Sequence, residues 1–216
     1  MAAKIFSQMR KKEITIINYG MGNLASLSNA FNHVGATVNI SEQAEKISRS
    51  GIVILPGVGS FKKAMKEIKK SNIDEAIYST LKRGNFLLCI CLGMQLLGSS
   101  STEDEFTKGL GIVKNKVKKF APKETNYKKI PHVGFNKIKF DPGNKLFDGL
   151  KEKSDFYFVH SYRMLPEKLK KNITKTDYGI EFLSSFNLEN IYATQFHPEK
   201  SQSNGLKLLE NFLKLT

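Results

Sequence analysis

Phe86-Leu-Leu-Cys-Ile-Cys91-Leu-Gly-Met-Gln95 is the stretch that decides the fold. Residues 86–90 are apolar throughout, which is typical of a strand buried on both faces of a sheet. Cys91 follows at once, and a helix is expected over 93–97. A residue between such a strand and such a helix stands on a sharp turn at the carboxyl edge of the sheet. The helix start also directs N–H groups toward the sulfur, which favours a thiolate. Cys91 is therefore a candidate nucleophile, whereas Cys89 lies within the strand and is expected to be a buried structural residue.

The segments before residue 86 alternate between strand and helix patterns. Strands are expected at 13–18, 38–40 and 52–55, and helices at 24–34, from residue 61, and at 74–83. This alternation indicates a mainly parallel sheet with helices on both faces.

The second half has a different pattern, in which strands follow one another through short connections. They are expected at 112–120, 132–140, 156–160, 180–186 and 191–195, before an amphipathic helix at 203–215. These strands should add antiparallel members to the sheet. The fold class is therefore α/β with a mixed, mainly parallel sheet, in a single domain over residues 13–216 that follows a basic N-terminal extension over residues 1–12.

Composition limits the classes of function. The 216 residues suit one domain, and no run approaches the ~18 apolar residues of a membrane-spanning helix. The basic N-terminus lacks the apolar core of a signal peptide, so we expect a cytoplasmic protein without membrane association. The two cysteines stand too close for an ordinary disulfide, and no Cys/His cluster has zinc spacing.

The net charge of +14 raises the question of nucleic-acid binding. Lysines gather in the first twelve residues, at 114–129 and at 168–175, but Tyr127 is the only aromatic residue among the lysines of 121–129. Nucleic-acid modules interleave aromatic and basic residues or carry a recognisable motif. A solvated lysine-rich surface is the preferred interpretation, and a basic nucleic-acid-binding module is a non-enzyme alternative.

A second motif is Gln195-Phe-His197-Pro-Glu199, directly after an expected strand. A histidine two residues before a carboxylate can be oriented by it and can direct its other ring nitrogen at a thiol. Pro198 stiffens the spacing because its ring fixes φ. Taken alone, His-Pro-Glu is more often an ordinary turn.

A third motif, Leu55-Pro-Gly-Val-Gly59, follows another short apolar run. Its glycines allow backbone N–H groups to turn toward a ligand, as an oxyanion hole requires. A phosphate-binding loop is the rival interpretation, but neither the P-loop nor the dinucleotide spacing fits.

In combination and in this order, the three motifs resemble the class I (triad) glutamine amidotransferases, which have a flavodoxin-like fold. Within that family the chain is most similar to the glutaminase subunits of imidazole glycerol phosphate synthase. The similarity extends from about residue 13 to nearly the end. Its segments are Tyr-Gly-Met-Gly-Asn-Leu (19–24), Leu-Pro-Gly-Val-Gly-Ser-Phe (55–61), Cys-Leu-Gly-Met-Gln-Leu-Leu (91–97), Gly-Leu-Gly-Ile (109–112), Ile-Pro-His-Val-Gly-Phe-Asn (130–136), Tyr-Phe-Val-His-Ser-Tyr (157–162) and Gln-Phe-His-Pro-Glu-Lys-Ser (195–201).

The resemblance implies glutamine hydrolysis by a Cys91–His197–Glu199 triad through a thioester. Leu92 and, after a peptide flip, Val58 would supply the oxyanion N–H groups. Positions that match those holding the substrate are Gly59, Gln95, Ser161 and Tyr162. No cofactor and no metal are implied.

The resemblance also implies a heterodimer with a (β/α)8-barrel synthase subunit, which receives the ammonia. Together the subunits would make imidazole glycerol phosphate and aminoimidazole carboxamide ribotide in histidine biosynthesis. Matching partner-facing positions are Asn23, His132, Phe135 and Lys200, and Phe135 stands where the family usually has tryptophan. That departure and the basic extension leave open a paralogous glutaminase that feeds another synthetase, such as a sugar-modifying enzyme. A cysteine peptidase or chaperone-like relative of similar fold is disfavoured by His-Pro-Glu after a late strand.

Overall fold

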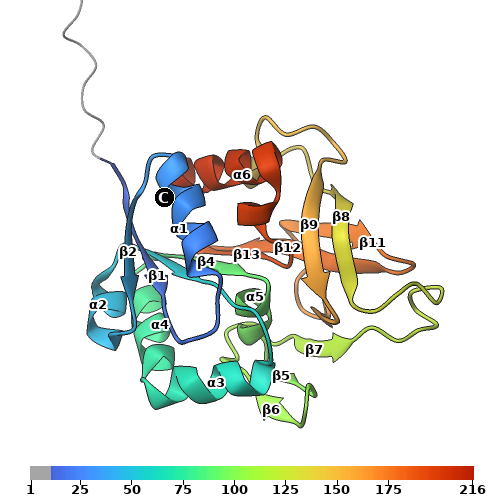
Figure 1. Cartoon of the computed structure of the whole chain (residues 1–216), viewed down its shortest axis with the longest axis horizontal. Helices are drawn as coiled ribbons and strands as arrows, with labels where there is room; N and C mark the ends of the chain where they lie inside the picture. The colour runs from blue at the N-terminus through green and yellow to red at the C-terminus, as the bar shows by residue number, and fades with distance from the viewer. Residues whose placement is uncertain (1–10) are drawn as a thin grey trace, which may run out of the picture.

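A nine-stranded sheet runs through the computed structural model, which describes residues 11–216 (Figure 1). Most of the expected extension over residues 1–12 therefore lies outside the described residues. The strand order is β2 (Thr37–Ser41), β1 (Glu13–Ile17), β3 (Ile52–Leu55), β4 (Phe86–Ile90), β13 (Ile191–Thr194), β12 (Glu181–Leu188), β11 (Ile173–Asp177), β8 (His132–Lys139) and β9 (Asp155–His160).

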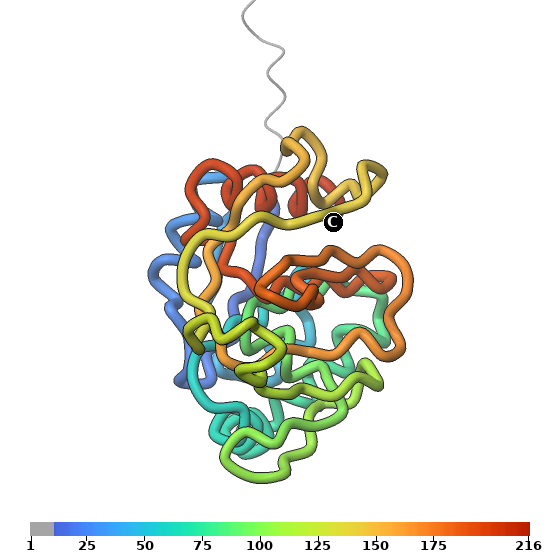
Figure 2. Tube along the Cα trace, turned by 90° about the vertical axis from the view of Figure 1, so that its right-hand side faces the viewer, coloured from blue at the N-terminus to red at the C-terminus, as the bar shows by residue number. Residues whose placement is uncertain are grey.

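The sheet has a parallel half and an antiparallel half that meet at β13. From β2 to β13 all neighbouring strands are parallel, and from β13 to β9 all are antiparallel. Figure 2 views the molecule from the side of the antiparallel half. The expected mixed α/β sheet is thus confirmed, and the candidate nucleophile and His-Pro-Glu follow the adjacent strands β4 and β13.

Helices cover both faces of the parallel half (Figure 1). One face carries α1 (Leu24–His33) and α6 (Gln202–Leu215), and the other carries α2 (Ala44–Arg49), α3 (Phe61–Lys70), α4 (Ile73–Lys82) and α5 (Leu92–Leu96). Strand β3 shows why its run is apolar throughout. Ile52 and Ile54 pack into the core under α1 and α6, while Val53 and Leu55 pack into the opposite core.

A small second sheet corrects the expectation for residues 112–120. Its order is β10 (Tyr162–Met164), β7 (Lys116–Lys119), β5 (Ser100–Ser101) and β6 (Thr107–Lys108). Strand β7 does form, but it pairs here and not in the main sheet. Its alternating pattern, with only Val117 fully buried, suits a strand that has one face in water.

Helix α2 and strand β11 were not expected, and neither were the short strands β5, β6 and β10 of the second sheet. Helix α2 has six residues and one fully buried side chain, Ile47, so it carries little periodicity. Strand β11 lies in a lysine-rich region whose charge conceals the alternation of the buried Thr174 and Thr176 with the exposed Lys175 and Asp177. Among residues 11–216, no helix is both long and apolar enough to span a membrane.

Candidate functional site

Cys91 stands on a strained turn between β4 and α5. Its φ of 54° and ψ of −108° lie in a region that residues other than glycine rarely adopt. The Cys91 N–H donates to the Thr194 carbonyl at 2.7 Å, which ties the turn to the end of β13. The turn also requires Gly93, because a Cβ there would lie 2.0 Å from the Leu55 carbonyl oxygen. These contacts fix a sharp strand-to-helix turn, the geometry that a nucleophile elbow has.

His197 and Glu199 form a buried pair beside this elbow. His197 Nδ1 lies 2.7 Å from Glu199 Oε1, and the two side chains are 2% and 4% exposed. Glu199 lies in a one-turn 3-10 helix, η2 (Pro198–Lys200), which explains how a spacing of two residues closes the contact. The carboxylate therefore fixes the orientation of the imidazole.

The environment of His197 raises its pKa. Burial alone would lower it, but the charge of Cys91, together with the hydrogen bond to Glu199 and the charge of its carboxylate, outweighs burial and raises the pKa to about 10. These neighbours favour the protonated form of the ring. This arrangement suits proton transfer to a leaving group.

The backbone of His197 is tied to β9. Its N–H donates to the Tyr157 carbonyl at 2.9 Å, and the two residues form an isolated antiparallel bridge. Ser201 completes the link, because its hydroxyl donates to the His197 carbonyl at 2.6 Å and accepts from the Tyr157 N–H at 2.9 Å. The position of the histidine thus depends on strand β9.

The loop of Pro56 to Gly59 lies against the start of α5. The Leu92 N–H, which opens α5, donates to the Gly57 carbonyl at 3.4 Å. The Tyr19 hydroxyl donates to the Pro56 carbonyl at 2.7 Å, which anchors the start of the loop. Gly59 has a φ of +100°, and Val58 is 38% exposed. A carbonyl, and not a second N–H, therefore faces the Leu92 donor.

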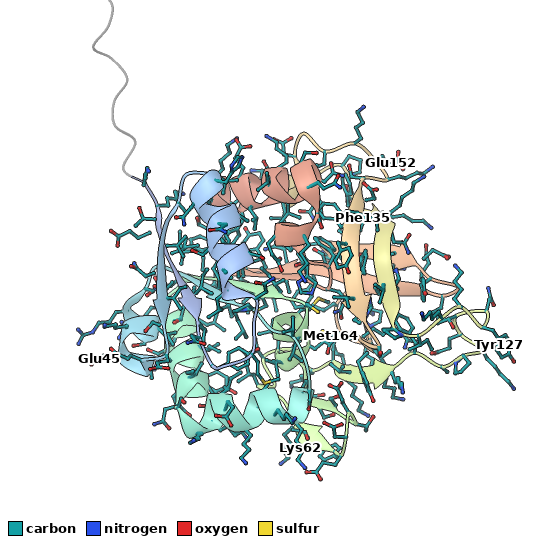
Figure 3. All side chains as sticks on the ribbon, in the orientation of Figure 1. Glu45, Lys62, Tyr127, Phe135, Glu152 and Met164 are labelled. Atoms are coloured by element: carbon teal, nitrogen blue, oxygen red, sulfur yellow. The ribbon has the colours of Figure 1, made fainter. Side chains whose placement is uncertain are left out.

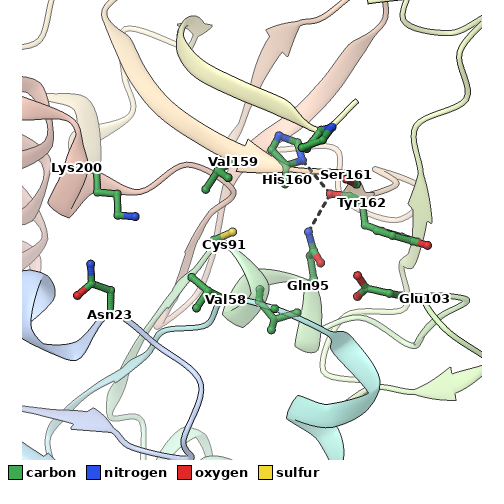
Figure 4. A pocket seen from close by; sticks show the side chains of 13 residues that line it. Asn23, Val58, Cys91, Gln95, Glu103, Val159, His160, Ser161, Tyr162 and Lys200 are labelled. Atoms are coloured by element: carbon green, nitrogen blue, oxygen red, sulfur yellow. Dashed lines mark hydrogen bonds between the residues drawn. The ribbon is translucent and has the colours of Figure 1, made fainter. Parts of the chain in front are cut away.

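A cavity of about 500 Å³ opens at Cys91 (Figure 4). The residues expected from the sequence that line it are Asn23, Val58, Gly59, Cys91, Leu92, Gln95, Ser161, Tyr162 and Lys200. Figure 4 shows Gln95, Glu103 and Tyr162 on one side of Cys91, and Asn23 and Lys200 on the other. Residues from both halves of the chain thus converge on the sulfur.

Two titratable residues of the cavity, Glu103 and His160, were missed by sequence reasoning. The Glu103 carboxylate accepts the Phe61 N–H at 2.8 Å, and burial raises its pKa. It stands in the acidic run of residues 103–105 within a basic chain, which was the available signal. Among the described residues no group of three or more His, Cys, Asp or Glu side chains is arranged to hold a metal.

The polar wall of the cavity is joined by hydrogen bonds. Gln95 Nε2 donates to the Tyr162 carbonyl at 2.9 Å, and His160 Nδ1 lies 2.8 Å from the same oxygen (Figure 4). His132 Nδ1 lies 3.2 Å from His160 Nε2. Burial lowers the pKa of His132 to about 4 and that of His160 to about 3, so both rings are neutral at physiological pH.

The β8–β9 hairpin exposes a face to solvent whose end beside the cavity is apolar. Val133 is 55% exposed and Phe135 47% (Figure 3), and they pair across the hairpin with Val159 and Tyr157. His132 does not belong to this face, contrary to expectation. It is 2% exposed because alternate residues of β8 point to opposite faces, and its ring stacks on Tyr178.

A cysteine on a strained strand-to-helix turn beside a buried histidine–carboxylate pair defines a class, the cysteine-dependent hydrolases on an α/β sheet. Residues 15–215 match the model of the family "Glutamine amidotransferase class-I". The chain is 46% identical over 198 residues to "Imidazole glycerol phosphate synthase subunit HisH" of Aquifex aeolicus, covering 91% of this chain and 94% of that one. It is also 46% identical over 202 residues to "Imidazole glycerol phosphate synthase subunit HisH 2" of Methanococcus maripaludis, covering 93% and 98%. The chain belongs to the class-I glutamine amidotransferases and is an enzyme of that family.

Solved structures agree on the fold. PurLQS from Thermotoga maritima superposes with a TM-score of 0.74 at 16% identity, covering 95% of this chain and 99% of that one. The glutaminase domain of CTPS from Trypanosoma brucei gives 0.65 at 14% identity, covering 94% of each chain.

Proposed function

We propose that this chain is the glutaminase subunit of an imidazole glycerol phosphate synthase in the cytoplasm, and that it releases ammonia from glutamine for a barrel synthase partner. The observation that carries the proposal is the buried His197–Glu199 pair beside Cys91, which stands on a strained turn. The similarity to HisH subunits over more than nine tenths of the chain supports the choice of pathway.

In the proposed chemistry the Cys91 sulfur attacks the side-chain amide carbon of glutamine. His197 gives its proton to the departing nitrogen, the C–N bond breaks, and ammonia leaves a γ-glutamyl thioester. The neutral imidazole then takes a proton from water, which attacks the thioester and releases glutamate and the thiolate. Glu199 keeps the ring oriented throughout.

The cavity wall supplies complementary groups for free glutamine. Glu103 offers a negative charge on the same side of Cys91 as Gln95 and Tyr162 (Figure 4), where it suits the α-ammonium group. Gly59 and the backbone of Ser161 and Tyr162 line the same space. A charged recognition site of this kind favours the free amino acid over glutamine within a peptide.

We propose that the loop of Pro56 to Gly59 is in a resting conformation, in which the oxyanion hole has one N–H donor, Leu92, and lacks the second. Leu92 N–H already donates to the Gly57 carbonyl, so a tetrahedral oxygen would meet a lone pair there. Rotation of the Gly57–Val58 peptide would replace that carbonyl with the Val58 N–H. Because one missing oxyanion donor costs about 10²–10³ in rate, this single rotation suffices as a switch.

The β8–β9 face is the proposed docking site for the barrel partner. It is apolar, it adjoins Lys200 and the cavity, and β9 holds His197 through the Tyr157 bridge. Docking at this face thus reaches the triad directly. Asn23 and Lys200 line the cavity on the side of Cys91 away from Gln95, and we assign ammonia release to that side.

The test measures glutamate release by the chain alone, with the barrel synthase from the same genome, and with that complex plus its nucleotide ligand. We expect low, intermediate and high turnover, respectively. Labelling with 6-diazo-5-oxo-norleucine should modify Cys91, as peptide mass mapping would show. A label elsewhere would refute the triad. If the chain alone were fully active and the barrel synthase did not stimulate it, the proposed partner would be wrong, while the proposed glutaminase activity would stand.

A further inference from the structure

Gln195 contacts the nucleophile and has no role in the chemistry described above. It directly follows β13, is fully buried, and its Nε2 donates to Cys91 Sγ at 3.6 Å. Its own N–H donates to the Ser184 carbonyl at 2.8 Å, which fixes the backbone at this point. Because the chain is extended here, alternate residues point to one side, and Gln195 and His197 both face the sulfur.

The orientation of the Gln195 amide is determined by its neighbour Gln95. Gln95 Nε2 donates to Gln195 Oε1 at 2.9 Å and to the Tyr162 carbonyl at 2.9 Å. A flipped Gln195 would set two NH₂ groups against each other and direct a lone pair at the sulfur. A flipped Gln95 would set two oxygens against each other. The donor of Gln195 is therefore the only group it can present to Cys91.

The Tyr162 carbonyl is itself held from behind. His160 Nδ1 must donate to it, so His160 Nε2 accepts from His132 Nδ1, and His132 Nε2 accepts from Asn136 Nδ2 at 3.3 Å. Each neutral ring has one donor and one acceptor, so the carbonyl at one end sets both tautomers. The chain of hydrogen bonds runs in one direction, from Asn136 on β8 to the oxygen that orients Gln95.

We propose that Gln195 is a further catalytic residue, which stabilises the Cys91 thiolate through its Nε2–H, and that Gln95 positions it. This inference rests on the proposed glutaminase function. A thiol sulfur is a weak acceptor, whereas hydrogen bonds to charged groups are about twice as strong as neutral ones. The contact therefore favours the thiolate before attack and again when water expels the sulfur from the thioester.

Other titratable groups near the sulfur are His197 and Tyr19, which interact with its charge, and four that line the same cavity, Glu103, His160, Tyr162 and Lys200. All of them remain in a Gln195→Met variant, which keeps the side-chain length and loses only the amide. The variant isolates the contribution of one neutral donor. A purely structural role would change melting temperature or KM, but it would leave the pH dependence of sulfur reactivity in place.

The test is the rate of Cys91 alkylation by iodoacetamide from pH 5 to 10, with glutaminase kinetics of the partnered complex. For Gln195→Met we expect the midpoint of the alkylation profile to rise by about one pH unit, and the plateau at high pH to stay equal or rise. The alkylation rate at high pH should not fall, because a less stabilised thiolate is more nucleophilic. We expect kcat to fall ~10- to 100-fold, since a hydrogen bond to a charged group is lost, with KM changed less than ~3-fold.

Ser185→Ala is the matched control, because Ser185 is buried on the neighbouring strand β12 and its hydroxyl has no partner among the described residues. It should keep the wild-type profile. If Gln195→Met does not fold, Gln195→Asn carries the same test, because it withdraws the donor by one methylene. A wild-type profile and kcat in a folded variant would overturn the role of Gln195. A wild-type complex without glutaminase activity would instead overturn the proposed function, since alkylation needs no glutamine.

Discussion

Cys89 and Cys91 stand two positions apart in the chain and have different surroundings. Cys89 lies inside β4, is fully buried, and burial raises its pKa well above the usual value. Cys91 lies past the strand end, lines the cavity and faces His197. The strand boundary between them, and not the chemistry of the residue, separates a thiol enclosed in the core from one that lines the cavity.

We therefore predict that Cys91→Ala lowers glutamine turnover of the complex by at least ~10⁴-fold, as loss of a nucleophile does in other triad enzymes. Cys89→Ala should keep glutamine turnover within ~2-fold of the wild-type value, because the Cys89 side chain contacts only the hydrophobic core. Coupled measurement of glutamate release checks both. An active Cys91→Ala protein would contradict the mechanism.

The two neutral imidazoles, His132 and His160, predict a specific acid sensitivity. Their pKa values in the folded chain, about 4 and about 3, lie below the unfolded value near 6.5. The unfolded chain therefore binds more protons below pH 6.5, and stability falls as the pH falls toward 4. Each histidine contributes up to about 1.4 kcal/mol per pH unit in this window.

His160→Gln removes one of these titrations. We expect the variant to be less stable than wild type at pH 7, since a hydrogen bond to Tyr162 is disturbed, and the difference to narrow toward pH 5. Urea denaturation at pH 7, 6 and 5 measures it. A gap that stays constant over this range would show that His160 does not titrate as its burial requires.

Sequence reasoning singled out Cys91, His197 and Glu199, which the structure brings together, because each follows a strand end at a recognisable spacing. It missed Glu103, His160 and the contact of Gln195, although Gln195 begins the motif that contains His197. Their positions depend on hydrogen bonds between segments up to 104 residues apart, as for Gln195 and Cys91. No local sequence pattern predicts that the Gln195 amide contacts the Cys91 sulfur, or that the His132 side chain is buried.

At the scale of elements, helix α6 lies unusually close to the His-Pro-Glu turn. A Cβ on Gly205 would lie 1.8 Å from the Pro198 carbonyl oxygen. Alanine normally stabilises a helix interior relative to glycine. Here the helix and the turn would have to separate, which would displace the Glu199 carboxylate.

Gly205→Ala should therefore lower the free energy of unfolding by at least about 2 kcal/mol, the scale of overpacking in a tight core. Glutaminase activity should fall as well, because the turn holds His197 and Glu199. Gly51→Ala is the control, since a Cβ there meets nothing within 4 Å. Thermal denaturation and glutaminase kinetics of the two variants test this prediction. Equal stability and equal activity of the two would contradict the close contact between Gly205 and Pro198.

Long apolar runs such as β3 and β4 could be predicted from the sequence with their correct bounds, because burial on both faces leaves a continuous signal. The placement of β7 could not, because its residues specify a half-buried strand and not which sheet receives it. Helix α2, which is short, and strand β11, which lies in a lysine-rich region, also lacked a signal, since their stability comes from neighbours and not from their own pattern.

At the scale of the whole molecule, the two edges of the main sheet differ. Phe135 belongs to the β8–β9 hairpin at one edge and is 47% exposed, while Ile40 on β2 at the other edge is 49% exposed. Only Phe135 lies on an apolar surface next to the cavity and the Tyr157–His197 bridge.

Phe135→Asp should weaken binding of the barrel partner by ~30-fold or more, the scale of an aromatic anchor at an interface. Labelling of Cys91 by 6-diazo-5-oxo-norleucine should persist in the isolated variant. Ile40→Asp, a change of equal exposure at the opposite edge, should leave affinity unchanged. Calorimetric titration with the partner compares them, and equal effects would place the docking face elsewhere.

The hydrogen bond from Leu92 to Gly57 also bears on the search for inhibitors. An aldehyde that mimics glutamine would add to the Cys91 sulfur and form a thiohemiacetal, whose oxygen needs the place that the Gly57 carbonyl holds. Such a compound must displace the Gly57 carbonyl before its oxygen can accept the hydrogen bond from the Leu92 N–H. Screening against the isolated chain would therefore undervalue these compounds, and a library should be tested against the partnered form.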